Sequence, residues 1–192
     1  MSAHHLVVGL TGASGAFATK ILLDRSAWPV TLITSVQGRK VYEQEVGSIV
    51  ELEKKAALVL DDADLGAPVA SGTVPTAGMV VLPCSVNTLG KIGVGISDSL
   101  ITRAAHCQLK EGRKVVLCVR EAPWTVMNIR SAESVALAGG TIMPLSPPFY
   151  MSKDRTPQTI TMAEVLTHYV DHLLGFLGQK VEKDWSDLCN SG

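Results

Sequence analysis

Small polar residues and glycines follow several apolar runs of this chain, at positions where a strand would give way to a helix. The first such turn, TGASGA (11–16), places Ser14 between two glycines after the run LVVGL. Backbone N–H groups at a helix start, together with a hydroxyl, favour a phosphate. The same glycines also suit a tight turn that needs them for geometry alone. The segment is neither GxGxxG nor a P-loop, so both interpretations stay open.

A second turn, PCSVNT (83–88), follows the apolar run GMVVL. Ser85 and Thr88 are spaced as hydroxyls in the first turn of a helix, where either can cap it. Cys84 could act as a nucleophile only as an activated thiolate. It follows a proline at the end of an apolar run, and no histidine lies near it in the sequence. The turn therefore predicts a ligand-holding backbone and hydroxyls, with Cys84 as a packed side chain.

Two charged residues, Arg120 and Glu121, directly follow the apolar run KVVLCV (114–119). Charges at the end of a buried strand are costly unless they are paired or used. They are either an ion pair that closes the strand or part of an anion site, because the planar fork of arginine grips a phosphate or a flavin edge.

The remaining charged and sulfur-bearing residues carry weaker signals. Arg103 and Lys110 share one face of a predicted helix and read as an ordinary solvated stripe. His168 and His172 form an i,i+4 pair, but without HExxH or a third ligand they predict no metal site. The cysteines show neither CxxC pairing nor metal-ligand spacing, so we expect reduced thiols in a cytoplasmic protein: Cys84, Cys107, Cys118 and Cys189.

These turns require a frame of alternating strands and helices. Short apolar runs predict strands at the start of 5–25 and within 29–35, 78–83, 114–119 and 141–150. Helical patterns occupy the rest of 5–25, a stretch ending near Glu45, and segments 48–60, 87–95, 98–110, 125–138 and 161–178, while 61–76 reads as a surface excursion. The pattern predicts a doubly wound α/β sandwich with a mainly parallel sheet, whose ligands bind beyond the carboxyl ends of the strands.

Length and composition set the outer limits. At 192 residues, the chain is expected to form one domain over 1–180, followed by a polar tail at 181–192. Hydrophobic residues make up 46% and charged residues 18%, a balance that favours self-association. The net charge of −1 and the lack of basic blocks argue against nucleic acid as a partner. No apolar run reaches the roughly 18 residues of a membrane span.

Taken in order along the chain, the motifs resemble the flavin prenyltransferases, the family that includes the partners of the ubiquinone-pathway and yeast phenylacrylate decarboxylases. The resemblance extends from Val7 to about Gly178 and is looser at 47–66. No single motif is specific, whereas their order is. They are GLTGASGA (9–16), PCSVNT (83–88), LITRAAHCQLKEGRK (100–114), REAP (120–123) and PPFY (147–150).

The resemblance implies a flavodoxin-like three-layer αβα fold and a homo-oligomer, typically a dodecamer, with sites between subunits. It also implies metal-independent transfer of a dimethylallyl group to N5 and C6 of reduced FMN. The donor would be dimethylallyl phosphate or pyrophosphate, and the prenylated FMN would serve a separate UbiD-type decarboxylase.

By position, the resemblance assigns three groups of residues. Proton handling near the reacting atoms falls to Ser14, Glu45 and Glu121. Contacts to the donor phosphate fall to Arg103, Lys110, Tyr150 and, in the last helix, His172. Flavin binding falls to Gly12, Ala13, Ser14, Ser35, Ser85, Val86, Asn87, Thr88 and Arg120.

The chain departs from the family near its end. Where the family has an arginine that binds the donor phosphate, this chain has His172, and the segment MSKDRTPQT (151–159) is longer than usual. Lys153 or Arg155 offers a replacement cation. The departure leaves open a second function, an FMN-binding paralogue that stores or delivers flavin without prenyl transfer.

A third function, oxidative decarboxylation of a cysteine-containing substrate, is raised by PCSVNT and VMN. These are similar to the PASANT and PMN signatures of FMN-dependent cysteine decarboxylases. Those enzymes require a catalytic histidine early in the chain, and the corresponding stretch here, GRKVYEQEV (38–46), contains none.

Overall fold

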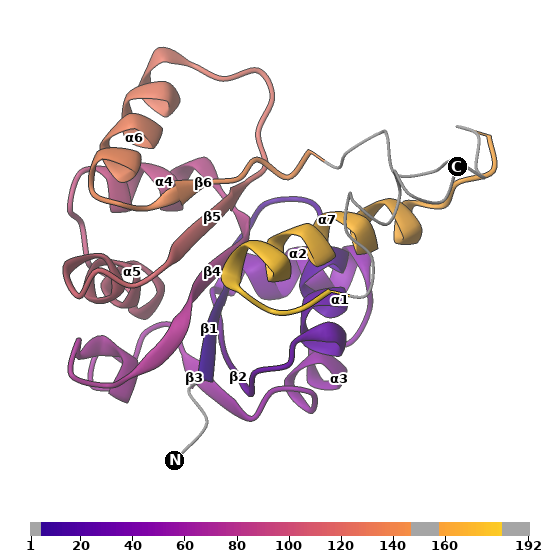
Figure 1. Cartoon of the computed structure of the whole chain (residues 1–192), viewed down its shortest axis with the longest axis horizontal. Coiled ribbons are helices and arrows are strands. Elements are labelled where there is room, and N and C mark those ends of the chain that lie inside the picture. The colour runs from indigo at the N-terminus through magenta and orange to yellow at the C-terminus, as the bar shows by residue number, and fades with distance from the viewer. Residues whose placement is uncertain (1–4, 147–157, 182–192) are drawn as a thin grey trace.

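The computed structural model describes residues 5–146 and 158–181. Within these ranges, strands and helices alternate along most of the chain (Figure 1). The strands are β1 (His5–Leu10), β2 (Val30–Thr34), β3 (Leu58–Asp61), β4 (Thr76–Cys84), β5 (Val115–Val119) and β6 (Thr141–Ile142). The helices are α1 (Phe17–Arg25), α2 (Val36–Glu45), α3 (Ile49–Glu53), α4 (Val86–Gly93), α5 (Leu100–Lys110), α6 (Val126–Leu137) and α7 (Met162–Leu177), with a short 3₁₀ helix at Pro68–Ala70.

The strands of the described chain form one sheet in the order β3-β2-β1-β4-β5-β6, and every pairing is parallel. The chain winds outward from β1 to β3 and then returns to place β4 on the other side of β1. The winding direction therefore reverses between β1 and β4, which is where open α/β sheets leave a crevice for ligands. The predicted doubly wound, flavodoxin-like fold is confirmed.

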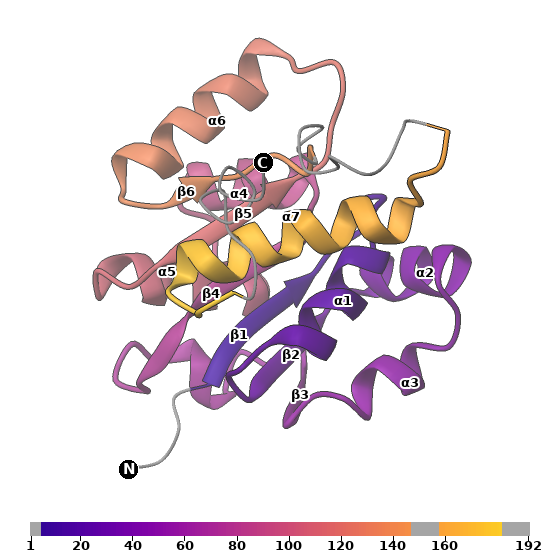
Figure 2. The same cartoon turned by 45° about the vertical axis from the view of Figure 1, so that its right-hand side comes forward.

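Side chains alternate along the strands and so build two separate cores. On one face, Leu6, Val8 and Leu10 of β1 pack beneath α1 and α7. On the other face, Val7 of β1 and Met79 of β4 pack beneath α4, α5 and α6. Figures 1 and 2 show the resulting three layers, with α1, α2 and α7 on one side of the sheet and α4 and α5 on the other. Strands buried on both faces explain the continuous apolar runs in the sequence.

The last helix, α7, lies along α1 and closes the first core. Its buried residues include Leu166, Tyr169 and Leu173. Arg25 at the end of α1 donates two hydrogen bonds to the Asp171 carboxylate of α7, from Nε at 2.5 Å and from an Nη atom at 2.9 Å. The tail beyond Val181 lies outside the described residues.

One element prediction was wrong. The segment 48–60 reads as a helix in the sequence, but α3 ends at Glu53 and Leu58–Asp61 is the edge strand β3. Leu58 and Val59 remain about two-fifths exposed because β3 has only one neighbour, β2. Its apolar residues belong to the run AALVL (56–60), which follows the charged stretch ELEKK with no turn residue between them and so continues a helical pattern in the sequence. The surface excursion therefore begins only after Asp61.

Candidate functional site

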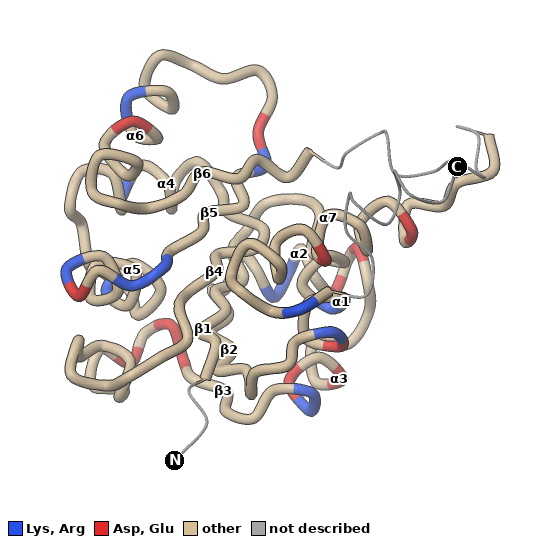
Figure 3. Tube along the Cα trace, in the orientation of Figure 1, with Lys and Arg blue, Asp and Glu red and all other residues tan. Residues whose placement is uncertain are grey.

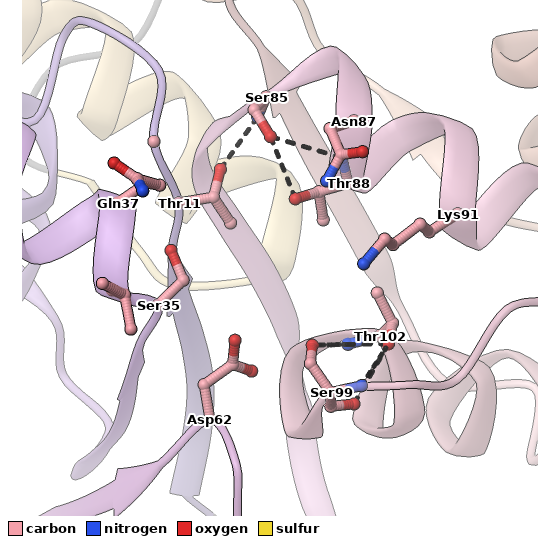
Figure 4. A pocket seen from close by; sticks show the side chains of 12 residues that line it. Thr11, Ser35, Gln37, Asp62, Ser85, Asn87, Thr88, Lys91, Ser99 and Thr102 are labelled. Carbon is pink, nitrogen blue, oxygen red and sulfur yellow. Dashed lines mark hydrogen bonds between the residues drawn. The ribbon is translucent and has the colours of Figure 1, made fainter.

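The carboxyl ends of the first four strands surround a cavity of about 400 Å³. Figure 4 shows its side chains converging from the turns after β1, β2, β3 and β4 and from the start of α5. Most of them carry hydroxyl or amide groups, whereas Asp62 and Lys91 are charged. The lining consists of Thr11, Gly12, Ser35, Val36, Gln37, Asp62, Ser85, Asn87, Thr88, Lys91, Ser99 and Thr102.

Thr11 links the ends of β1 and β4, the two strands between which the winding direction reverses. Its Oγ1 donates to the Pro83 carbonyl at 2.8 Å and accepts from the Ser85 N–H at 2.8 Å. Thr11 is 2% exposed, so these bonds are shielded from water. The hydroxyl thus sets the position of the β4–α4 turn relative to β1.

Helices α2 and α4 begin at the cavity, each with a serine cap. The Ser35 hydroxyl accepts from the Gly38 N–H at 3.0 Å, and the Ser85 hydroxyl accepts from the Thr88 N–H at 3.3 Å. The N–H groups between each cap and its partner belong to Val36 and Gln37 in α2 and to residues 86–87 in α4. They have no protein acceptor within the described chain. The first turn of a helix leaves such groups unpaired, and they attract anions. Two helix starts thus offer free donors to the cavity.

Helix α5 also begins at the cavity, but its first N–H groups are already taken. Ser99 and Thr102 form a reciprocal capping box. The carbonyl and one carboxylate oxygen of Asp62 accept from the N–H groups of Leu100 and Ile101, at 2.7 and 2.8 Å. This helix start is therefore saturated by protein groups.

The TGASGA turn lies beside α2 and binds Glu45. A carboxylate oxygen of Glu45 accepts from the N–H groups of Gly15 and Ala16, at 2.9 and 2.8 Å. Ser14 is exposed within the same turn. The structure thus brings Ser14 and Glu45, two of the three predicted catalytic residues, to one turn.

Glycine is required in this turn for steric reasons. A Cβ atom at Gly12 would lie 2.5 Å from the Cβ atom of Gln37 in α2. Gly15 has a φ of +98°, which L side chains rarely adopt. Both alternatives raised by the sequence are therefore compatible: the glycines serve the turn geometry, and Gly12 also lines the cavity.

Arg120 and Glu121 follow β5 and do not form an ion pair with each other. The Arg120 N–H donates to the Cys84 carbonyl at 3.0 Å, but its exposed guanidinium has no hydrogen bond or ion pair within the described residues. Glu121 is half-buried; one carboxylate oxygen accepts from the Ala122 N–H at 3.0 Å, and its carbonyl accepts from the Trp124 indole at 3.0 Å. The guanidinium is thus available to a ligand.

Among the described residues, those assigned to the donor phosphate do not line this cavity. Arg103 is exposed on α5, and its Nε donates to the Ala70 carbonyl at 3.1 Å. Lys110 ends α5, at the opposite end of that helix from Ser99, and pairs with Glu111 at 2.7 Å. His172 is exposed on α7. Tyr150, Lys153 and Arg155 lie outside the described residues.

The described cysteines are buried free thiols: Cys84, Cys107 and Cys118. Burial raises the pKa of Cys84 far above its ordinary value and that of Cys118 to about 12. Burial likewise raises the pKa of the Tyr169 phenol, whose hydroxyl donates to the Met143 carbonyl at 2.7 Å. Neither thiol is a thiolate at neutral pH, so Cys84 is the packed residue that the sequence predicted.

The described residues contain no group of three or more His, Cys, Asp or Glu side chains placed to hold a metal ion. Lysine and arginine are interleaved with aspartate and glutamate rather than gathered on one element (Figure 3). None of the described helices combines the length and apolar character needed to cross a bilayer.

Sequence reasoning missed part of the cavity lining. Ser99 and Thr102 have the spacing of a helix cap, which was a usable signal. Asp62 was hidden because β3 was not recognised as a strand, so the residue after it did not count as a strand-end residue. The other missed residues are Thr11, Val36, Gln37 and Lys91.

Comparison with known proteins places this architecture in a family. A family model described as Flavoprotein matches residues 1–145. The flavin prenyltransferase UbiX of Salmonella typhimurium is 39% identical over 174 residues, which cover 88% of this chain and 89% of the relative.

Solved structures agree with the sequence comparison. The crystal structure of AnUbiX (PadA1) in complex with FMN and dimethylallyl pyrophosphate superimposes with a TM-score of 0.85 at 30% identity, covering 95% of this chain and 99% of that chain. A dodecameric FMN-dependent UbiX-like decarboxylase from Escherichia coli O157:H7 gives a TM-score of 0.84 at 31% identity, covering 94% and 98%.

Proposed function

This chain is a prenyltransferase that belongs to the flavin prenyltransferase family, and from that premise we propose its reaction. It binds reduced FMN and transfers a dimethylallyl group to it from dimethylallyl phosphate or pyrophosphate. The product, FMN prenylated at N5 and C6, is then used by a UbiD-type decarboxylase. The proposal needs a flavin site, proton-handling groups and a site for the leaving phosphate.

The observation that carries the proposal is the pair of free helix starts at the cavity. The N–H groups of Val36, Gln37, Val86 and Asn87 have no acceptor within the described chain and can donate to an anionic group, and the phosphate of FMN is such a group. Gly12, which has no room for a side chain, lets the flavin approach the backbone. A cavity of about 400 Å³ lies in the ordinary range for a cofactor of this size. The residues present therefore fit FMN.

The remaining flavin contacts follow from the same edge of the sheet. Ser35 and Ser85, with Thr88, border the phosphate position, and Ala13 and Ser14 continue the turn from Gly12. Arg120, whose guanidinium is free within the described residues, binds the flavin as a cation with a planar fork.

Reduced FMN would supply the nucleophilic N5 and C6 atoms. The protein's own residues handle the protons that these atoms release. Ser14 lies in the turn after β1, Glu45 at the end of α2 bonds to that turn, and Glu121 follows β5, so all three lie near the carboxyl edge of the sheet. Positioned carboxylates of this kind can exchange protons with a bound group when they lie within hydrogen-bonding distance.

Departure of the phosphate from an allylic donor leaves growing negative charge on the leaving group. Fixed cationic and hydroxyl donors stabilise that charge. Arg103, Lys110, Tyr150 and His172 are the proposed donors. Because Arg103 and Lys110 lie outside the cavity of their own chain, they serve the cavity of a neighbouring copy in a homo-oligomer, a dodecamer by analogy with the relative described above.

The test is direct. The protein is incubated anaerobically with reduced FMN and dimethylallyl phosphate, or with the pyrophosphate in a parallel sample. The mass of the extracted flavin is then measured by mass spectrometry. We expect a mass gain of one dimethylallyl unit. A flavin of unchanged mass with both donors would contradict prenyl transfer, and the better donor would identify the natural leaving group.

One observation favours a second function. His172 replaces an arginine that the family uses for the donor phosphate, which leaves a flavin-storing or flavin-delivering protein as the alternative. That alternative predicts FMN binding without a mass gain. Cysteine decarboxylation predicts carbon dioxide release from a peptide with a C-terminal cysteine, and the absence of histidine from 38–46 speaks against it.

A further inference from the structure

Three helices begin at the cavity, and they differ in whether their first N–H groups are already bonded to the protein. The first turns of α2 and α4 leave two N–H groups each without a protein acceptor in the described chain. In α5, Asp62 accepts from Leu100 and Ile101, and Ser99 accepts from Thr102. A carboxylate of the protein thus occupies the position that an anionic ligand would take at α5.

Asp62 also brings a negative charge to the cavity. Figure 4 shows its carboxylate between Ser35 and Ser99, pointing into the space that the lining residues surround. Lys91 is the one basic residue of the lining, and its ammonium group pairs with Asp98 at 2.7 Å rather than with Asp62. The charge of Asp62 therefore faces the ligand without a lysine or arginine partner among the described residues.

Flavin cofactors differ in how many phosphates they bring. FMN has one, which the starts of α2 and α4 can hold. A flavin dinucleotide continues from that phosphate into a second one, and this second anion would need further donors. The remaining helix start in the lining is that of α5, where it would meet a carboxylate in place of free N–H groups, and like charges in close contact are strongly unfavourable.

We propose that Asp62 is a specificity-determining residue that restricts the cavity to a flavin mononucleotide and rejects the dinucleotide. The inference rests on the proposed function, because it takes the cavity to be the flavin site. It goes beyond it by assigning a discriminating role to a residue that need not form a favourable contact with FMN at all.

The test compares the affinities of the full-length protein for FMN and for FAD by isothermal titration calorimetry. Asp62→Asn keeps an oxygen that can accept from Ile101 but removes the charge. Asp62→Ala removes both the charge and the acceptor. Asp64→Asn is the matched control. Asp64 lies on the same loop, is exposed and does not line the cavity, and its carboxylate accepts from the Gly66 N–H.

We expect the wild type and Asp64→Asn to bind FMN at least about tenfold more tightly than FAD. In Asp62→Asn the ratio of the two dissociation constants falls by about tenfold through tighter FAD binding, and in Asp62→Ala it falls further because the Ile101 N–H becomes free. A ratio that stays at the wild-type value in Asp62→Asn, with FMN affinity retained, overturns the inference.

Two further outcomes distinguish a failure of this inference from a failure of the proposed function. Wild-type protein that binds FAD as tightly as FMN overturns the inference alone. Wild-type protein that binds neither flavin overturns the proposed function and the inference together.

Discussion

At the residue scale, the side chains around the cavity divide by whether their polar atoms are already used. Some of these atoms form hydrogen bonds within the protein, as in Thr11, Ser85 and Asp62. The Arg120 guanidinium has none within the described residues. A preorganised site needs both kinds, because the first group holds the frame and the second meets the ligand.

Replacing Arg120 by alanine tests the second kind. We expect FMN binding to weaken by roughly ten- to a hundredfold, since a hydrogen bond to a charged group contributes about 1.5–3 kcal/mol. Thermal stability should change little, because within the described residues Arg120 bonds to the protein through its backbone alone. The measurement is FMN titration beside a melting curve. An Arg120→Ala protein that purifies with full flavin content would show that the turn after β5 is not part of the flavin site.

Glu121→Gln separates binding from turnover. The amide keeps the size of the side chain and an oxygen that can accept from Ala122, but it cannot take up a proton at neutral pH. We therefore expect normal FMN affinity and a loss of prenylated product of about a hundredfold or more, measured by mass spectrometry under anaerobic conditions. Undiminished product formation would remove Glu121 from the proton-handling group.

His172 allows a gain-of-function test. The planar guanidinium of arginine can donate two parallel hydrogen bonds to a phosphate, whereas an imidazole ring cannot, so a histidine holds a phosphate less firmly. We expect His172→Arg to lower the KM for dimethylallyl phosphate while leaving FMN affinity unchanged, and His172→Ala to raise that KM. Indifference of the KM to both changes would show that α7 makes no contact with the donor. His168→Arg, one turn earlier on α7, is the matched control.

At the element scale, the starts and ends of helices are what bring the site together. Helix α1 has no side-chain cap of its own at Ala16, and Glu45 from the end of α2 supplies the acceptor instead. A carboxylate at a helix start is favoured by the aligned backbone dipoles. Glu45 thus has a structural role in joining two elements as well as a proposed catalytic one.

The two roles of Glu45 predict different results for two substitutions. Glu45→Ala should lower the free energy of unfolding by about 1 kcal/mol, as the loss of a helix cap does. Glu45→Gln retains the acceptor and should lower it less. If Glu45 also handles protons, both variants lose prenylated product to a similar extent. Turnover that follows stability, with Glu45→Gln active, would indicate a structural role alone. Urea denaturation and the mass assay give the two measurements.

At the scale of the whole molecule, the protomer leaves an apolar face uncovered. Helix α6 exposes Val126, Met127, Ile129 and Leu137, the last being 83% exposed, and buries only Val135. Exposed apolar patches of this kind mark protein–protein contacts. Together with the position of Arg103 and Lys110 outside their own cavity, this face fits the proposed homo-oligomer.

Charge placed on α6 should therefore dissociate the assembly. We expect Met127→Glu to shift the molar mass in light scattering from an oligomer toward smaller species, whereas Met127→Leu leaves it unchanged. If Arg103 and Lys110 serve the cavity of a neighbouring copy, as proposed, prenyl transfer should fall together with the oligomer. An unaltered mass for Met127→Glu would place the subunit contacts elsewhere.

The parallel sheet, a ligand cavity at its carboxyl edge and the family could all be predicted from the amino-acid sequence. Buried strands leave continuous apolar runs, and each is followed by a turn whose residue types are visible in the sequence, as at Ser35, Ser85 and Arg120. The ordered motifs then identified the flavin prenyltransferases. The edge strand β3 was missed because its apolar run AALVL (56–60) follows the charged stretch ELEKK with no turn residue between them, so the whole segment reads as one helix.

Which of these residues meet depends on how the chain folds. Spacing along the chain does not specify the strand order, so neither the bonds of Glu45 to the TGASGA turn nor those of Asp62 to α5 could be read from the sequence. Arg103 and Lys110 lie outside the cavity of their own chain because α5 lines it only at its start, through Ser99 and Thr102. Distances between residues far apart in sequence are set by the winding of the sheet and by how the helices pack on it, and these contacts exist only once the chain has folded.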